Sequence, residues 1–325
     1  MPTVSIITPL YNKGPYVAET LGSVRAQTVA GWELIVVENG SSDDGPEQVR
    51  HLADRDDRIR LVASPRRGPG AARNFGLAHA TGEWVLFLDA DDLIEPAYLE
   101  MQLAAAARHP NASIIAGFWQ EFRDDDGRKM VLHEPSGLSW SRPKFLDYAI
   151  AYTCWAIHAA IIRRNALGVD TAWPEELDCY LAEDTVFWFR LVDAHEVAYS
   201  QCKGALYRTQ TPGCRTQSQV VEAWFAGLHA AANANVAWLE QHGRAPTAGQ
   251  MESLFRLYTG LYVQARCQSN PAFAKTARHQ AEAWLSRRRE TGGLPGWSIR
   301  LATRLGVPIF AILSSWRLKM RSKTT

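Results

Sequence analysis

The sequence predicts an α/β fold, in which a mostly parallel, doubly wound sheet has helices on both faces and a helical region follows. Short apolar segments rich in β-branched residues alternate with segments of helical periodicity up to residue 92. This alternation is typical of parallel strands joined by crossover helices. From residue 220 onward, long helical patterns replace it. We therefore expect an α/β domain over residues 1–215 and a helical region over residues 216–325.

The strands expected first in the chain are short, apolar and bounded by turn signals, and they cover residues 4–9, 32–37, 59–63 and 84–88. The helices expected between them cover residues 16–27, 42–53 and 69–80. The helix at 42–53 opens with Ser42, Asp43 and Asp44. Side chains of this kind suit the positive end of a helix dipole, so we expect that helix to begin there.

The pattern between residues 113 and 219 is mixed. We expect one strand at 113–122, a hairpin turn at 123–127, helices at 144–150 and 184–193, and a further strand within 196–207. Residues 155–166 fit either a strand or a helix. Three long helices are expected at 220–241, 247–267 and 271–289, with a glycine-rich break at 292–296.

Polar clusters follow three of the expected strands, at the point where each strand ends. They are Pro9-Leu10-Tyr11-Asn12, Glu38-Asn39-Gly40 and Asp89-Ala90-Asp91-Asp92. In doubly wound sheets, ligands bind outside the carboxyl ends of the strands. The sequence therefore predicts that the three clusters form one site.

Asp89-Ala90-Asp91 is the candidate metal site. Two carboxylates one residue apart repel each other, and each raises the pKa of the other. A divalent cation such as Mg²⁺ or Mn²⁺ relieves that repulsion, and it shares its remaining coordination positions with water and substrate phosphates. A solvated acidic turn is the alternative for this pattern taken alone.

The segment Gly68-Pro69-Gly70-Ala71-Ala72-Arg73 has an alternative interpretation as the glycine-rich loop of a dinucleotide-dependent oxidoreductase. Three features count against it. The third glycine is replaced by Arg73, the loop follows the third strand rather than the first, and the acid downstream belongs to an acidic cluster. An arginine near a helix start instead suits a phosphate or carboxylate ligand.

Several motifs occur in order over about residues 3–210. They are Pro9-Leu10-Tyr11-Asn12, Leu21–Thr28, Val36–Asp43, Gly70–Glu83 and Phe87–Asp92. Their succession resembles family 2 of the glycosyltransferases, which have the A-type nucleotide-sugar fold. The resemblance implies inverting transfer of a sugar from a nucleotide diphosphate donor, most commonly a UDP-sugar, to a saccharide or lipid-linked saccharide hydroxyl.

The resemblance also implies roles for residues on the donor side. Pro9 and Tyr11 match the loop that holds the nucleobase, and Glu38 matches an acid that contacts base or ribose. The family usually has Asp at that place, so Glu38 is a departure. Arg73 matches an arginine near the nucleotide. Within Asp89-Ala90-Asp91, Asp91 matches the direct metal ligand, while Asp89 lies nearer the ribose and the metal.

On the acceptor side, Glu183-Asp184 resembles the family's Glu-Asp motif. Asp184 then matches the base that deprotonates the acceptor hydroxyl, and Glu183 matches a neighbour that orients the acceptor or a loop. Arg208 lies in a segment that closes over the donor and is a candidate to reach the diphosphate, although the histidine that often follows is missing. Trp155 is a candidate to stack on a sugar ring, with core packing as the alternative.

Charge is unevenly distributed along the chain. Residues 287–325 carry a net charge of +8, which leaves −7 for the rest. The basic and apolar stretch at 297–323 is therefore a candidate for contact with an anionic membrane surface, with packing on the helices as the alternative. No signal peptide, spanning helix or nucleic-acid partner is predicted, and five cysteines without a C-x-x-C pair suggest free thiols.

These features predict a cytoplasmic enzyme, with peripheral attachment to the inner face of the cell membrane as an option. A polysaccharide of the cell surface is then the expected product. The alternative is a catalytically silent protein that binds nucleotide sugars on the same fold.

Overall fold

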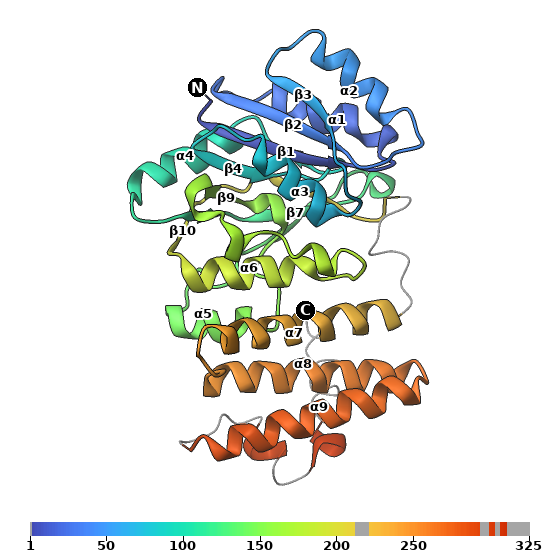
Figure 1. Cartoon of the computed structure of the whole chain (residues 1–325), viewed down its shortest axis with the longest axis vertical. Helices are drawn as coiled ribbons and strands as arrows, with labels where there is room; N and C mark the ends of the chain where they lie inside the picture. Colours follow the sequence, from blue (N-terminus) through green and yellow to red (C-terminus); the bar gives the residue numbers. More distant parts are fainter. Residues whose placement is uncertain (1, 212–220, 293–298, 303–305, 311–325) are drawn as a thin grey trace. The chain divides into compact units, whose positions relative to one another are not determined.

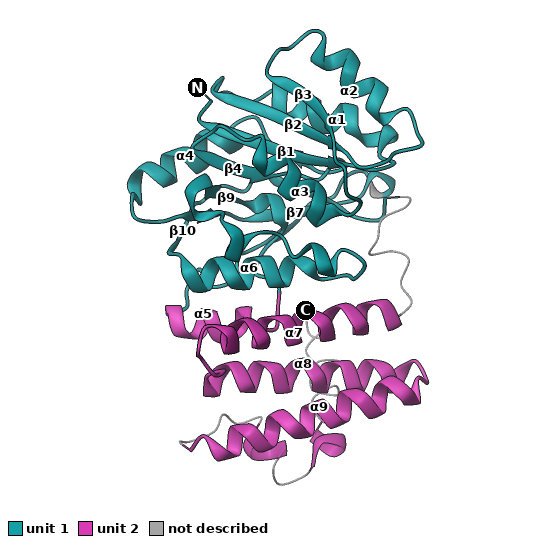
Figure 2. Ribbon diagram, in the orientation of Figure 1, with its two compact units in different colours: residues 1–140, 153–218 teal, residues 141–152, 219–325 magenta. Residues whose placement is uncertain are grey.

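The computed structural model describes residues 2–211, 221–292, 299–302 and 306–310. The chain forms two compact units, one of residues 1–140 with 153–218 and one of residues 141–152 with 219–325 (Figure 2). The boundary expected between residues 215 and 216 lies outside the described residues. Residues 141–152 leave the first unit, form part of the second, and return the chain to the first at Thr153.

The first part of unit 1 alternates strands and helices as predicted (Figure 1). Its elements are β1 (Val4–Leu10), α1 (Gly14–Arg25), β2 (Trp32–Glu38), α2 (Gly45–Ala53), β3 (Ile59–Ala63), α3 (Pro69–Ala78) and β4 (Trp84–Phe87). The strands lie parallel in the order β3-β2-β1-β4. The strands β2 and β3 are added on one side of β1, and β4 is added on the other side. Such a switch in strand order opens a crevice at the carboxyl ends of the strands.

The helix α3 lies very close to the sheet because of Gly76. A Cβ atom at this position would come within 2.4 Å of the Ile7 side chain and 2.9 Å of the Val37 side chain. The glycine therefore lets the α3 backbone rest directly on β1 and β2. This close packing fixes the position of Arg73, which lies one turn earlier on the same helix.

The remaining elements of unit 1 extend this sheet and build a second one. They are β5 (Leu93–Ile94), α4 (Tyr98–Arg108), β6 (Ile114–Ala116), β7 (Trp119–Phe122), β8 (Val131–His133), β9 (Ala160–Arg163), α6 (Glu183–Ala194), β10 (Val197–Tyr199) and β11 (Ala205–Arg208). The larger sheet has the order β10-β6-β9-β4-β1-β2-β3. Only β9, within the described part of this sheet, runs antiparallel to its neighbours, so the predicted mostly parallel sheet is confirmed.

The prediction of a single strand at 113–122 is wrong. This segment forms two strands, β6 in the larger sheet and β7 in a second sheet of order β5-β11-β7-β8. The chain crosses between the sheets at Gly117 and Phe118, whose N–H groups donate to the carbonyls of Ala159 and Cys202 at 2.8 Å. The single strand expected within 196–207 is likewise two strands, β10 and β11.

The helix expected from Ser42 begins three residues later, at Gly45. The polar residues before it are used in the loop instead. The Asp43 carboxylate accepts hydrogen bonds from the backbone N–H groups of Gly14 at 2.7 Å and Gly45 at 3.1 Å. The Asn12 side chain accepts one from the Ser42 N–H at 2.8 Å. These contacts tie the loop after β2 to the loop after β1, at the edge where the predicted site lies.

Unit 2 is helical, and its three long helices were predicted. Its helices are α5 (Arg142–Ala149), α7 (Val221–Gln241), α8 (Ala248–Cys267) and α9 (Pro271–Glu290). Thr247 caps α8 by accepting a hydrogen bond from the Gln250 N–H at 3.1 Å. The same Thr247 hydroxyl donates to Asp147 on α5 at 2.6 Å, and this contact joins the short helix to the long ones.

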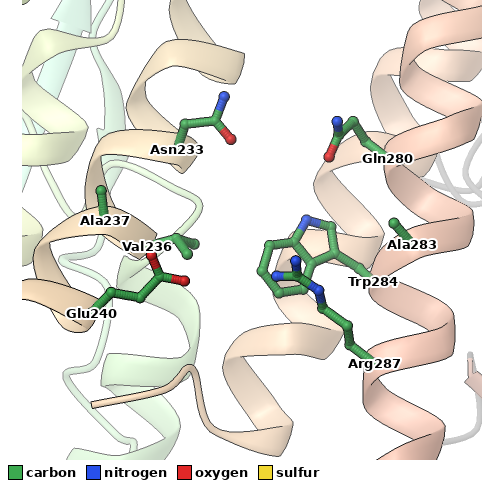
Figure 3. A pocket seen from close by; sticks show the side chains of 8 residues that line it. All are labelled: Asn233, Val236, Ala237, Glu240, Gln280, Ala283, Trp284 and Arg287. Atoms are coloured by element: carbon green, nitrogen blue, oxygen red, sulfur yellow. The ribbon is translucent and has the colours of Figure 1, made fainter. Parts of the chain in front are cut away.

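A hollow of about 250 Å³ lies between α7 and α9. Figure 3 shows Asn233 and Glu240 on one side of it, facing Gln280, Trp284 and Arg287 on the other. The Arg287 guanidinium lies 4.8 Å from the centre of the Trp284 ring. The indole is therefore covered by a side chain of its own helix.

The basic stretch at 297–323 lies mostly outside the described residues. In its described parts, Ile299, Val307 and Phe310 are buried, while Ile309 is exposed. The Phe310 ring packs on Phe255 of α8, 5.6 Å between centres. None of the helices in the described ranges has the length and apolar character needed to span a bilayer.

Candidate active site at the carboxyl edge of the sheet

The acidic loop Asp89-Ala90-Asp91-Asp92 follows β4 after one residue, Leu88, and neighbouring elements hold its residues. The Asp89 carboxylate accepts a 2.7 Å hydrogen bond from Arg73 Nη2. The Ala90 carbonyl accepts one from the Thr20 hydroxyl on α1 at 3.0 Å. Burial works against ionisation of Asp89, but the Arg73 guanidinium holds its pKa below the usual value. Asp89 is therefore a stable carboxylate.

The Asp91 carboxylate is held by a lysine. Lys13 Nζ lies 2.6 Å from Asp91 Oδ2 and also donates to the Thr211 hydroxyl at 3.1 Å. The Thr211 hydroxyl in turn donates to Asp91 Oδ2 at 2.9 Å. The side chains of Lys13 and Asp91 are 16% and 13% exposed, so a cation lies against this carboxylate in a largely buried position.

Asp92 forms a third pair inside the protein, with a histidine. Its Oδ2 atom lies 3.1 Å from His158 Nδ1, and both side chains are buried. Its Oδ1 atom accepts a hydrogen bond from the Arg208 N–H at 2.8 Å. Burial raises the pKa of Asp92 to about 6, whereas the His158 pKa rises because Asp92 outweighs the opposing effect of burial. This pair ties the acidic loop to β11 and to the segment before β9.

Arg208 was predicted as a candidate to reach a diphosphate, but its guanidinium is used to hold the acidic loop. It is 2% exposed. Its Nε donates to the Asp91 carbonyl at 2.8 Å, and its terminal nitrogens pair with Glu19, at 2.5 Å, and with Asp124. In this arrangement Arg208 supports the backbone of the loop.

Arg73 connects the acidic loop to the second acidic centre, Glu183-Asp184. Its Nη2 is on Asp89, and its Nη1 lies 3.8 Å from Glu183 Oε1. The guanidinium also lies 4.3 Å from the centre of the Trp173 ring. Asp89 and Glu183 are far apart in the chain, so this buried arginine is the physical link between the two predicted centres.

Asp184 is the second residue of α6 and is half-buried. Burial and the neighbouring Glu183 carboxylate raise its pKa to about 7, although Arg73 opposes the shift. The Thr153 hydroxyl lies 3.3 Å from Asp184 Oδ2 and 2.8 Å from the Thr185 hydroxyl. A carboxyl group with a pKa near neutrality can accept and release a proton at physiological pH.

The N-terminus of α3 already holds an anion from the protein itself. The Asp178 carboxylate accepts hydrogen bonds from the N–H groups of Gly70 at 2.7 Å and Ala71 at 3.0 Å. Side chains on Gly68 or Gly70 would collide with Asp178, at 2.1 and 2.6 Å. The glycines thus make room for an internal carboxylate. In this structure, the anion at the start of α3 is the Asp178 side chain.

The residues predicted for the nucleobase lie at the ends of β1 and β2. Tyr11 is 58% exposed. Glu38 Oε1 accepts hydrogen bonds from the N–H groups of Gly40 at 2.6 Å and Ser41 at 2.5 Å. The longer side chain of glutamate therefore closes its own turn. Pro9 is the partly exposed residue near the end of β1.

Trp155 is 1% exposed, and its ring centre lies 5.1 Å from that of Trp188. Because the ring is buried, a sugar could stack on it only if the side chains that cover it moved away. The structure thus places Trp155 in the core, which was the alternative interpretation. Glu183 is also buried, beside Arg73.

The acidic loop fits a divalent cation in its donor chemistry. Asp91 offers carboxylate oxygens, and Thr211 offers a hydroxyl group beside them. The Lys13 ammonium already places a positive charge next to Asp91 Oδ2. Among the described residues, no group of three or more Asp, Glu, His or Cys side chains is placed to hold a metal ion, either at this loop or elsewhere. A metal at this loop would therefore take few protein ligands and complete its shell with phosphate oxygens and water, as Mg²⁺ commonly does.

Lys13 and Asp178 are among the site residues that the sequence did not point to. Lys13 follows Tyr11-Asn12 directly after β1, and a positive charge at a strand end that faces an acidic loop was a usable signal. Asp178 gave no such signal, because it lies after the short 3₁₀ turn Glu175–Leu177, in a region without periodicity.

One family of known proteins matches about half of this chain. Residues 5–168 match the sequence profile of the family described as Glycosyl transferase family 2. The putative glycosyltransferase EpsH of Bacillus subtilis is 36% identical over 129 residues, which are 40% of this chain and 37% of that protein. The match thus spans well under half of that relative's length.

Two solved structures have a similar fold. One is S. aureus TarS in complex with UDP-GlcNAc, with a TM-score of 0.57, 19% identity, and coverage of 94% of this chain and 92% of that one. The other is the mannosyltransferase PcManGT of Pyrobaculum calidifontis in complex with GDP-Man and Mn²⁺. It has a TM-score of 0.54, 20% identity, and coverage of 96% and 86%.

Proposed function

The chain belongs to glycosyl transferase family 2, and from this membership we propose that it transfers a hexose, with inversion, from a nucleoside diphosphate sugar to a saccharide hydroxyl. The observation that carries the proposal is the position of Arg73, which lies on Asp89 of one acidic centre and near Glu183 of the other. A reaction between two substrates needs a leaving-group site and a base in one place, and Arg73 brings the candidates for both together.

The donor's nucleobase would lie at the ends of β1 and β2. The exposure of Tyr11 supports this, since an exposed aromatic side chain can stack on a base. Pro9 and Glu38 border the same place. UDP is the proposed nucleotide, and TarS, a protein of similar fold, is solved with UDP-GlcNAc.

Asp91, with Asp89 beside it, would hold Mg²⁺ or Mn²⁺ together with the donor's diphosphate. The metal would supply positive charge that stabilises the departing nucleoside diphosphate. Arg208 keeps the Asp91 backbone in place through the carbonyl contact, and Thr20 does the same for Ala90. The protein thus holds the acidic loop rigidly before the donor binds.

Asp184 would act as the general base. The acceptor hydroxyl oxygen forms a bond to the anomeric carbon of the donor, the bond from that carbon to the diphosphate oxygen breaks, and Asp184 takes the hydroxyl proton. A raised pKa favours this role because the carboxylate is then a better proton acceptor. Glu183 keeps Asp184 in this state by its charge and holds Arg73.

The acceptor is proposed to be a saccharide, free or lipid-linked, used in a cell-surface polysaccharide. The protein would then work in the cytoplasm, and residues 297–323 would attach it to an anionic inner membrane surface through their basic side chains. The catalytic role is proposed for the region up to residue 215, and the helical region from 216 would support attachment or the acceptor.

Calorimetric titration of the purified chain with UDP, with and without Mn²⁺, tests the donor site. We expect binding that depends on Mn²⁺ and is lost in Asp91→Ala. Asp125→Ala is the matched control, because Asp125 is a strongly exposed acid in the hairpin between β7 and β8. UDP binding that is equal in all three proteins would contradict the proposed role of Asp91. Binding without transfer of any sugar would favour the silent nucleotide-sugar binder.

A further inference from the structure

Each carboxylate of the acidic loop faces its own basic side chain. Asp89 faces Arg73, Asp92 faces His158 and Asp91 faces Lys13. Arg73 and His158 are almost fully buried, at 3% and 1% exposure of the side chain. Arg73 contacts Asp89, Glu183 and the Trp173 ring, and His158 contacts Asp92. Lys13 is different, because its side chain is partly exposed and ends on Asp91 and Thr211.

The chemistry of lysine also sets Lys13 apart from the other two. An ammonium group is a compact charge on a flexible four-carbon chain, whereas a guanidinium is a rigid planar fork. Lys13 precedes the first residue of α1 and follows the segment Pro9–Asn12 at the end of β1. A change in its side-chain torsions can therefore move the charge without moving the sheet.

We propose that Lys13 is an exchangeable counter-ion: it holds Asp91 until the metal and donor arrive, then leaves Asp91 and binds the donor's diphosphate oxygens. This inference rests on the proposed function. Two cations at one carboxylate oxygen repel each other, and Lys13 Nζ lies directly on Asp91 Oδ2. The metal and the ammonium thus compete for the same oxygen. The diphosphate brings the negative charge that the displaced ammonium needs.

The exchange has a clear consequence for the donor-free protein. Lysine keeps Asp91 oriented by Nζ and by the Thr211 hydroxyl, so that the carboxylate is in place before the donor binds. The same contact weakens binding of a metal alone. With Lys13 in place, the metal therefore binds Asp91 well only when it arrives together with the diphosphate.

Electron paramagnetic resonance of free Mn²⁺, titrated with the nucleotide-free full chain, measures this competition directly. In Lys13→Met the competing charge is gone, so we expect Mn²⁺ to bind about tenfold more tightly, the order of effect that a neighbouring charge has on a carboxylate. Lys13→Gln should behave in the same way. Lys13→Arg keeps the charge and should stay close to the wild type, as should Lys203→Met, which changes an exposed lysine elsewhere in unit 1.

Calorimetry with UDP in saturating Mn²⁺ gives the second readout. We expect the two neutral variants to bind UDP about tenfold more weakly, because the phosphate-binding charge is lost. Unchanged or weaker Mn²⁺ binding in both neutral variants would overturn the inference while leaving the proposed function intact. If the wild type binds no UDP even with Mn²⁺, the proposed function fails, and the inference fails with it.

Discussion

Arg73 Nη2 lies 2.7 Å from Asp89 Oδ1, and this ion pair has one almost fully buried partner and one that is partly exposed. The arginine serves two acidic centres that are distant in the sequence. Its removal would therefore affect both, and the pH dependence of the proposed transfer should report the effect on Asp184.

Replacement of Arg73 by Met should raise the pKa of Asp184, because the guanidinium lowers it. The acidic limb of the transfer rate should then move to higher pH. Removal of one member of a buried ion pair costs about 3–5 kcal/mol, and Asp89 is partly solvated, so we expect a loss of about 1–3 kcal/mol in the free energy of unfolding. Urea unfolding and a pH–rate profile measure the two effects.

Arg60→Met is the control for this variant, because Arg60 also pairs with a carboxylate, that of Glu33, but the Arg60 side chain is 43% exposed. Its effect on stability should stay below about 1 kcal/mol. Arg73→Lys should restore part of the pH profile, since it restores the charge. A pH profile of Arg73→Met identical to that of the wild type would show that Arg73 does not act on the base.

Asp184→Asn should reduce transfer by roughly 10²–10⁴-fold, the usual contribution of a general base, and leave UDP binding intact. In the wild type the rate should rise with pH through about 7, because the base must be ionised to act. Asp193→Asn, on the same helix, is the matched control. Full transfer by Asp184→Asn would show that another group takes the proton.

The same ionisation affects stability with a defined sign. The pKa of Asp184 is higher in the folded chain than its usual value, so between these two values the folded state binds more protons. The contribution of Asp184 to the free energy of unfolding therefore falls as pH rises towards 7. Chemical unfolding at pH 5 and pH 8 should show a smaller decrease for Asp184→Asn than for the wild type.

Asp178→Ala should lower the free energy of unfolding by about 1 kcal/mol, because α3 loses the acceptor for its first N–H groups. Asp178→Asn keeps an acceptor oxygen and should cost less. Asp170→Ala, an exposed acid in the same segment, is the control. Equal stability of all three variants would mean that water replaces Asp178 at the helix start without loss.

The first half of unit 1 could be predicted because its information is local. Strands such as Trp32–Glu38 are mostly apolar, and turns such as Glu38-Asn39-Gly40 mark where they stop. The convergence of polar clusters follows from the geometry of parallel sheets, so the place of the site could be predicted with the strands.

The missed features depend on contacts that are remote in the sequence. Asp178 reaches Gly70 across 108 residues, and Thr211 reaches Asp91 across 120. Neither pairing leaves a periodic pattern in the chain. The division of 113–122 between two sheets depends on the carbonyls of Ala159 and Cys202, which accept hydrogen bonds from its middle. Local propensity contains no information about such partners.

Residues 141–152 belong to the helical unit although they interrupt the sequence of the first unit, and this arrangement affects how the helical unit can evolve. The short helix α5 hydrogen-bonds to the start of α8 and to α7, through Asp147 with Thr247 and the Ile150 carbonyl with Asn235. The helical unit is thus encoded by two separate stretches of the gene. A recombination event that replaces only the 3′ stretch would leave α5 facing foreign partners, so the two stretches are expected to change together during evolution.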